Sequence, residues 1–256
     1  MKVVEILKKS STYSTSQIAG IFGVHVNTVR LYEQWGFISK ADRNKSNYRI
    51  FTDRHIIEFE FARMAIPGPY PVRTEIVRNA VREFAKGNYK DAMEFSKLYH
   101  ELSKTELLRA EEAFEILEKW ILNKYGHRDN VVFKTRKEII KSLDVTVDAL
   151  RTWERNGLFE IRRNESNILV FSEYDVEKIK IIRLLRNCGY SIASLLNVFS
   201  NDTDTQKHGV SELLSRYDEF SEFSYVTDRF IPYLKSHIDK SRTMIEFVEK
   251  MTEKKN

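Results

Sequence analysis

The sequence is poor in the residues that cross-link, kink or interrupt a chain. Its 256 residues include one cysteine, four prolines and nine glycines. With Cys188 alone, no disulfide can form within the chain, and no group of thiolates can hold zinc or an iron–sulfur centre. A lone thiol is typical of a reducing compartment, so we expect a cytoplasmic protein.

Membrane and catalytic signatures are missing as well. No apolar run reaches the roughly 20 residues that a membrane-spanning helix needs, so we expect no membrane contact. The sequence has no glycine-rich phosphate loop, no G-x-S-x-G nucleophile motif and no H-E-x-x-H zinc motif. Its six histidines are scattered singly rather than paired. The sequence therefore gives no support to an enzyme, a cofactor or a resident metal.

What is present is typical of a globular, mainly helical protein. Hydrophobic residues make up 42% of the chain and charged residues 31%, which is too apolar for a disordered protein. The apolar residues recur mostly at helical spacing, and strict alternation is short and local. The net charge of +5 suits a polyanionic partner, although a basic surface kept for solubility explains it equally well.

One pattern occurs twice along the chain. Residues 18–37 align with residues 139–158, and after one residue is omitted from the next loop the match continues through residues 47–70 and 167–190. Colinear identity at structural landmarks indicates two copies of one module. The identical pairs include Arg30 with Arg151, Glu33 with Glu154, Gly36 with Gly157, Asn47 with Asn167, Phe51 with Phe171, and Tyr70 with Tyr190.

The first copy has the pattern of a helix-turn-helix. Ser14 or Ser16 can cap a helix that runs to Phe22, and Gly23 interrupts it. A second helix is predicted over residues 26–35, with His25 at its N-cap and Gly36 just beyond its end. The spacing turns Val26, Val29 and Leu31 toward the core and Asn27, Thr28 and Arg30 away from it.

A β-hairpin wing and a third helix should follow. Phe37-Ile38 and residues 48–51 are two extended runs that flank the polar turn over residues 42–47, and Thr52 or Asp53 can begin the third helix. The second copy repeats these steps. Thr146 takes the N-cap, Gly157 ends the helix, residues 162–171 form the hairpin and Ser172 opens a helix over residues 173–187.

These segments resemble the MerR family of regulators. The resemblance is carried by residues 24–37 (VHVNTVRLYEQWGF), by the wing at residues 47–51 (NYRIF) and by residues 188–192 (CGYSI). It implies a two-headed DNA-binding protein whose recognition helices enter successive major grooves and whose wings hold the flanking backbone. We therefore expect a mainly α fold with two winged helix-turn-helix modules, small β-hairpin wings, and a helical tail with a long amphipathic helix after each module.

The resemblance also implies contact residues in the first copy. Arg30 and Tyr32 match recognition-helix contacts, and Arg43, Tyr48 and Arg49 match wing contacts. Arginine presents a planar fork to phosphate or guanine, and a tyrosine hydroxyl can donate to phosphate. For Tyr32 and Tyr48 the alternative that the ring packs beneath the helix stays open. The predicted first interface comprises His25, Asn27, Thr28, Arg30, Tyr32, Arg43, Lys45, Tyr48 and Arg49.

The second copy departs from the pattern. Ile168-Leu169 replaces the Tyr48-Arg49 pair, and Asp148 replaces Asn27, which places an acid on the presumed base-facing surface. This head could bind DNA weakly, read a different half-site, or be retained for packing alone. Its predicted interface comprises Thr146, Asp148, Arg151, Arg155, Arg162 and Arg163.

Two helical tails follow the modules. A long amphipathic helix is predicted over residues 90–125 and a second apolar helix face over residues 230–251, separated from the second module by a polar stretch over residues 200–209. We therefore predict four segments, 1–86, 87–127, 128–200 and 201–256. In the family the long helix forms an antiparallel dimer contact. Here the C-terminal helix could close that pair within one chain, as the short link over residues 126–132 favours, or two chains could form a homodimer with four heads.

The leading hypothesis is a sequence-specific transcription regulator that binds double-stranded DNA. RNA polymerase is a further candidate partner, and an aromatic group in the C-terminal region could line an effector pocket or serve as helix core (Phe220, Phe223, Tyr225, Phe230 and Tyr233). The alternative is an architectural or protein-interaction module. Arg30 with the Tyr48-Arg49 wing favours the regulator, because a module that binds only proteins would not need them.

Overall fold

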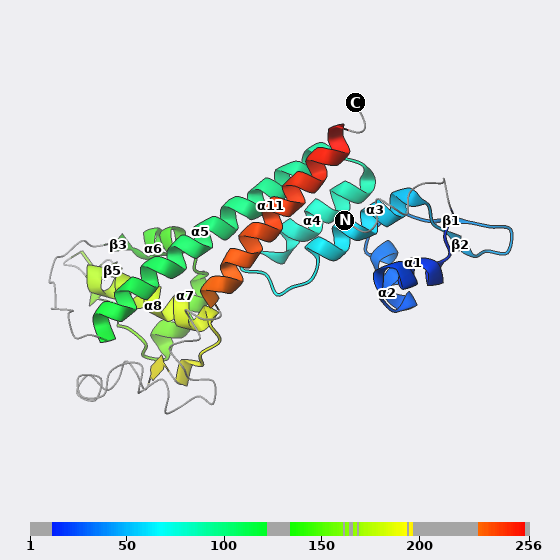
Figure 1. Cartoon of the computed structure of the whole chain (residues 1–256). Helices are drawn as coiled ribbons and strands as arrows, with labels where there is room; N and C mark the ends of the chain where they lie inside the picture. The colour runs from blue at the N-terminus through cyan, green and yellow to red at the C-terminus, as the bar shows by residue number, and fades with distance from the viewer. Residues whose placement is uncertain are drawn as a thin grey trace. The chain divides into compact units, whose positions relative to one another are not determined.

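The computed structural model describes residues 12–121, 134–160, 162–163, 166–167, 169–193, 195–196 and 230–253. The chain divides into two compact units, residues 1–106 with 234–256 and residues 107–233 (Figure 1). Several predictions fall outside the described residues: the end of the first long helix, the link over residues 126–132, the polar stretch over residues 200–209, Ile168, and the aromatic residues Phe220, Phe223 and Tyr225.

The first unit begins with the predicted helix-turn-helix. α1 (Thr15–Phe22) is capped by Ser14 rather than Ser16, through a capping box in which Ser14 and Gln17 bond each other's backbone. Gly23 ends the helix in the left-handed region, at φ 60°. α2 (Val26–Gln34) then begins after His25, whose Nδ1 accepts a hydrogen bond from the backbone of Asn27 at 3.2 Å. Both helix starts are thus set by local side-chain capping.

The wing differs from the prediction in where its first strand lies. β1 (Asp42–Arg43) pairs antiparallel with β2 (Arg49–Ile50), so the strand expected at Phe37-Ile38 is wrong. The amides of both residues bond the carbonyl of Tyr32 instead, and both side chains are buried. These two residues therefore close the end of α2 onto the core before the chain reaches the wing.

The core of this head includes buried residues of α1 and α2, of α3 (Asp53–Ala65) and of α4 (Thr74–Lys86). Thr52 is the N-cap of α3 and shares a capping box with His55. Val29 is fully buried, but Leu31 is 39% exposed, so its predicted core position is wrong. Two residues advance a helix by about 200°, and Leu31 therefore lies far from the face that Val29 buries.

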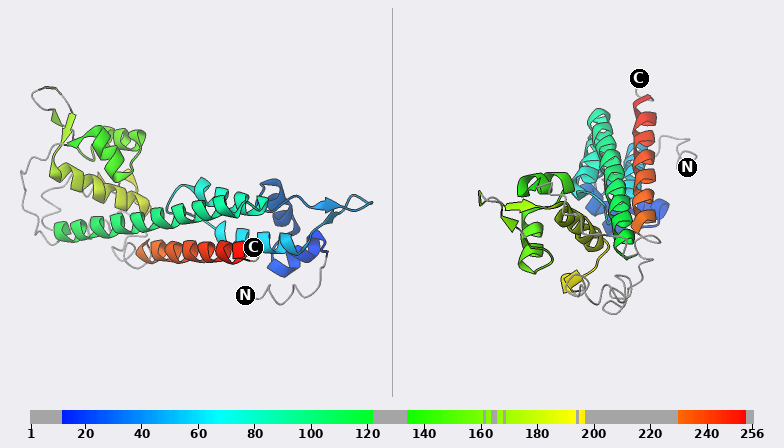
Figure 2. Two further views of the ribbon diagram at one scale, coloured as in Figure 1. Left: turned by 90° about the horizontal axis from the view of Figure 1, so that it is seen from above. Right: turned by 90° about the vertical axis from the view of Figure 1, so that its left-hand side faces the viewer.

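Two long helices complete the first unit. α11 (Ile231–Glu253) runs antiparallel to the first part of α5 (Tyr89–Ile121), beside it in all views (Figures 1 and 2). Phe247 of α11 also contacts the rings of Phe61 and Phe84. The buried positions of α11 are Leu234, His237, Ser241, Met244 and Val248, so the C-terminal helix belongs to the core of the first head.

The second unit repeats the first head's elements. In chain order they are β3 (Lys134–Thr135), α6 (Arg136–Leu143), α7 (Val147–Arg155), β4 (Arg162–Arg163), β5 (Leu169–Phe171) and α8 (Glu173–Asn187). The strands form one antiparallel sheet in the order β3-β5-β4. The later part of α5 contacts this head through Arg109 with Asp144 at 3.4 Å and Glu112 with Lys180 at 2.6 Å. The predicted fold class, mainly α with two winged modules, is confirmed.

Two further observations concern the described residues only. None of their helices is long and apolar enough to cross a membrane, and among them no three His, Cys, Asp or Glu side chains gather in a way that could hold a metal ion. Cys188 is buried at the end of α8, and this burial raises the pKa of its thiol to about 12. A thiol so protonated at neutral pH is a weak nucleophile.

Candidate nucleic-acid interface

The outward face of α2 carries the predicted base-reading residues of the first head. Asn27 and Arg30 are exposed, and Arg30 donates to the side chain of Asn27 at 3.3 Å. Thr28 is half-buried, and His25 is exposed while its ring caps the helix. α2 therefore presents an amide and a guanidinium from adjacent turns, two groups that can read base edges in a major groove.

Tyr32 lies on the opposite face of α2. Its side chain is 5% exposed, its ring stacks on Phe59 and it meets Phe37 edge-on. The structure therefore corrects the prediction that places Tyr32 in the interface and supports the alternative, in which the ring packs beneath the helix. The helical period explains this, because Tyr32 follows the buried Val29 by three residues.

The wing presents a polar tip. Arg43 donates to the backbone and side-chain oxygens of Asn47 at 2.9 and 3.2 Å, and Asn47 adopts a left-handed φ of 63°. Tyr48 is 73% exposed, and Lys45 is also exposed. The alternative of a packed ring therefore does not hold for Tyr48, whose hydroxyl is available to a partner. The tip offers two cations and a phenol within six residues.

Arg49 points toward α2 rather than outward. Its Nε lies 2.5 Å from Oε2 of Glu33, and Oε1 of Glu33 accepts from the backbone of Ala41 at 3.1 Å. The Glu33 side chain is only 9% exposed, so its charge depends on these two donors. Glu33 thereby links the recognition helix to β2 and to Ala41, the residue just before β1, and Arg49 has a positioning role that the sequence did not suggest.

A basic groove joins these elements. It has a volume of about 910 Å³ and is lined by Arg30 and Glu33 of α2, by Arg43 and Arg49 of the wing, and by residues of α3 and α4. Four cations on its walls were missed by the sequence analysis: Lys40, Arg54, Arg82 and Lys86. A signal was present for two of them, since Arg78, Arg82 and Lys86 recur every four residues opposite the apolar stripe of α4.

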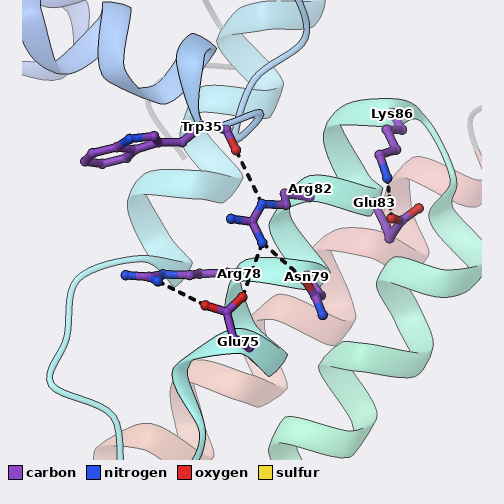
Figure 3. A network of polar contacts seen from close by, with 7 residues as sticks. All are labelled: Trp35, Glu75, Arg78, Asn79, Arg82, Glu83 and Lys86. Atoms are coloured by element: carbon purple, nitrogen blue, oxygen red, sulfur yellow. Dashed lines mark hydrogen bonds and ion pairs between the residues drawn. The ribbon is translucent and has the colours of Figure 1, made fainter.

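Arg82 connects α4 to the end of the recognition helix (Figure 3). Its Nε donates to the carbonyl of Trp35 at 3.3 Å, and its guanidinium lies 5.6 Å from the centre of the Phe37 ring. Glu75 and Asn79 each accept a hydrogen bond from the Arg82 guanidinium at 3.3 Å, and these bonds orient the Arg82 side chain. A cation at a helix C-terminus interacts favourably with the helix dipole, so Arg82 both stabilises α2 and orients it against α4.

The second head keeps part of this arrangement. Arg151 and Arg155 are exposed on α7, and Arg163 donates to the backbone of Asn167 at 2.8 Å, as Arg43 does to Asn47. Thr146 caps α7 by accepting from the backbone of Ala149 at 3.1 Å. Asp148 lies in the first helical turn, where the helix dipole favours an acid. Arg162 is in β4, and its side chain lies outside the described part.

Comparison with known proteins agrees with this geometry. A family model described as "MerR HTH family regulatory protein" matches residues 13–65 and 135–201. These two ranges contain α1 to α3 with the first wing and α6 to α8 with the second wing. Each head is therefore matched separately, as the internal repeat predicted.

Curated relatives match over a shorter stretch. The chain is 30% identical over 76 residues to the HTH-type transcriptional regulator ZntR of Escherichia coli (strain K12), and equally to that of Escherichia coli O157:H7. The matched stretch is 29% of this chain and 54% of each relative, so the chain spans about half the length of the curated relatives it matches. No solved structure matches the chain.

Proposed function

Because both heads of this chain are MerR-family helix-turn-helix modules, we propose that it is a sequence-specific transcription regulator that reads duplex DNA. α2 of the first head enters a major groove, Arg30 and Asn27 read base edges, and Arg43, Lys45 and Tyr48 of the wing hold the flanking phosphates. One observation carries this proposal. The recognition-helix arginine and the wing arginines line one basic groove, which suits a polyanion that passes from helix to wing.

The charges of the groove favour the same partner. Arg30, Lys40, Arg43, Arg49, Arg54, Arg82 and Lys86 face a single lining acid, Glu33. Arg49, Arg54, Arg82 and Lys86 are ion-paired with glutamates. The cations of the groove that are available to DNA are therefore mainly Arg30 of α2, Arg43 of the wing and Lys40, which lies between these two elements.

The assembly that we propose is a pseudo-dimer within one chain. Two contacts between α5 and α11 support it: Tyr99 with His237 at 2.5 Å and His100 with Ser241 at 2.9 Å. In this proposal α11 takes the place that a second subunit's long helix takes in the family. RNA polymerase remains a candidate partner, because the proposed regulator would act at a promoter.

Selection from random duplex DNA tests the proposal. The purified chain should enrich one motif, and Arg30→Ala should lower affinity for that motif by ~1–3 kcal/mol while folding stays intact. Lys104→Ala is a matched control, since it removes an exposed cation of α5 that is paired only locally with Glu101. Enrichment of no motif, or equal losses in both variants, would favour the architectural or protein-interaction alternative.

A further inference from the structure

The two heads correspond residue by residue at the recognition helix and the wing. α1 and α6 each have eight residues and follow a capping Ser14 or Thr135, so Thr15 and Arg136 occupy the same first position. The bridge between Tyr13 and Phe51 corresponds to the pairing of Lys134 with Phe171. Asn47 and Asn167 share a left-handed φ of 63° and 60° and accept the same arginine bond. Differences between equivalent positions can therefore be interpreted directly.

One such difference concerns the partner of the recognition-helix glutamate. In the first head Glu33 pairs with Arg49 of β2, at 2.5 Å. In the second head the equivalent Glu154 pairs with Nη2 of Arg136 on α6, at 2.7 Å. Leu169 stands where the first head has Arg49, and Thr15 stands where the second head has Arg136. Each head thus supplies one arginine to the equivalent glutamate, but from a different element, β2 in the first head and α6 in the second.

We propose that the basic anchor of the recognition helix, meaning the arginine that pairs with the helix's glutamate, is on β2 in the first head and has moved to α6 in the second. Arg136 is then the residue that positions α7. Its side chain is 25% exposed and its Nε is buried, so the guanidinium is held against the head rather than free in solvent. Glu154 is 34% exposed, and this partial burial makes a charged partner worth more to it than at a fully exposed site.

The change in which element supplies the arginine has a consequence for the wings. The Glu33 carboxylate ties the wing of the first head to α2 through Arg49 and Ala41. In the second head the arginine that bonds Glu154 belongs to α6, and position 169 brings no charge. The wing of that head therefore has no arginine at position 169 that could make the link which Arg49 makes in the first head. Only the effect of this difference on DNA rests on the proposed function; the positioning of α7 does not.

Hydrogen exchange of the full chain, followed by mass spectrometry, tests the positioning role. Arg136→Thr should speed exchange of the α7 amides by roughly three- to tenfold, since an interaction between charged, partly buried groups is lost. The α2 amides serve as an internal reference and should not change. Lys137→Ala, at the exposed neighbouring position of α6, is the matched control and should leave α7 unchanged.

Rescue distinguishes a moved anchor from a general defect. Arg136→Lys keeps the charge and should restore most of the protection, and Leu169→Arg combined with Arg136→Thr should restore it from the wing side. In the first head, Thr15→Arg should likewise offset Arg49→Leu at α2. The proposal is overturned if Arg136→Thr leaves α7 unchanged, if Lys137→Ala has the same effect, or if neither transferred arginine restores protection.

Measurements of DNA binding test the positioning role separately from the proposed function. Thr15→Arg with Arg49→Leu should keep α2 protected while DNA binding weakens, because the wing loses the arginine that links it to α2 through Glu33. Failure of the wild-type chain to bind any duplex would count against the proposed function alone. Loss of α2 protection from hydrogen exchange in the variant that combines Thr15→Arg with Arg49→Leu would count against the moved anchor.

Discussion

The hydroxyl of Tyr99 lies 2.5 Å from Nδ1 of His237, although 138 positions separate the two residues. The pair is buried between α5 and α11, and Tyr70 meets both rings at near edge-on angles. Burial, with a smaller effect of Lys240, lowers the pKa of His237 to about 4. The C-terminal helix is therefore held to the first head by a neutral histidine.

The stability of the first unit should consequently fall in mild acid. A histidine that titrates near 6.5 when unfolded and near 4 when folded binds more protons in the unfolded state between these values. Stability is full above about pH 6.5 and falls as the pH approaches 4, by on the order of 3 kcal/mol. Urea unfolding at several pH values measures this, with His237→Asn as the comparison. Equal slopes for both proteins between pH 6.5 and 4 would contradict the assignment.

The mass of the protein in solution should be that of one chain. α11 buries Leu234, Met244 and Val248, with Met244 and Val248 in the core of the first head, and an intramolecular partner benefits from its high effective concentration. Light scattering at low concentration, with and without DNA, measures the mass. A mass of two chains in the free protein would favour the homodimer with four heads.

Arg82 should be needed for the orientation of α2. We expect Arg82→Ala to cost about 0.5–1.5 kcal/mol of stability, since it removes a cation at a helix C-terminus and a cation–π contact. DNA affinity should fall in addition, although other cations remain in the groove. Arg78→Ala is the control, because Arg78 shares the partner Glu75 but lies outside the described contacts of α2. Equal affinities of the two variants would argue against an orienting role.

The wing tip should contribute to affinity without contributing to sequence preference. Lys45 is exposed at the turn of the hairpin, where a cation can meet phosphate but no base edge. Lys45→Ala should weaken binding to all duplexes similarly and reduce the slope of log affinity against log salt by about 1. Titrations at several salt concentrations measure the slope. A change in the selected motif instead would place Lys45 at a base.

The two heads should contribute unequally to binding. Arg30 and Arg151 occupy equivalent, exposed positions on α2 and α7, but the second head carries Asp148 and lacks a wing arginine at position 169. Arg30→Ala should therefore lower affinity more than Arg151→Ala does, and footprints should show one strong and one weak half-site. Two equal, inverted half-sites would be incompatible with this asymmetry.

Much of the fold is determined by the sequence alone, because the interactions responsible lie within a few residues. Capping by Ser14, His25, Thr52, Thr146 and Ser172 joins residues two or three positions apart. The glycines at positions 23, 36 and 157 meet left-handed backbone at helix ends. The repeat and the outward face of α2 follow from the same local rules, so they could be predicted without knowledge of tertiary contacts.

The tertiary structure decided where charged and polar side chains find their partners. The pairing of Glu33 with Arg49 spans 16 positions, that of Trp35 with Arg82 spans 47, and that of Tyr99 with His237 spans 138. An apolar stripe could not place His237 or Ser241 at a buried seam, since their polarity suggests solvent exposure. Arginine is equally suited to a phosphate and to a glutamate. Only the folded chain therefore shows that Arg49 and Arg82 position the recognition helix.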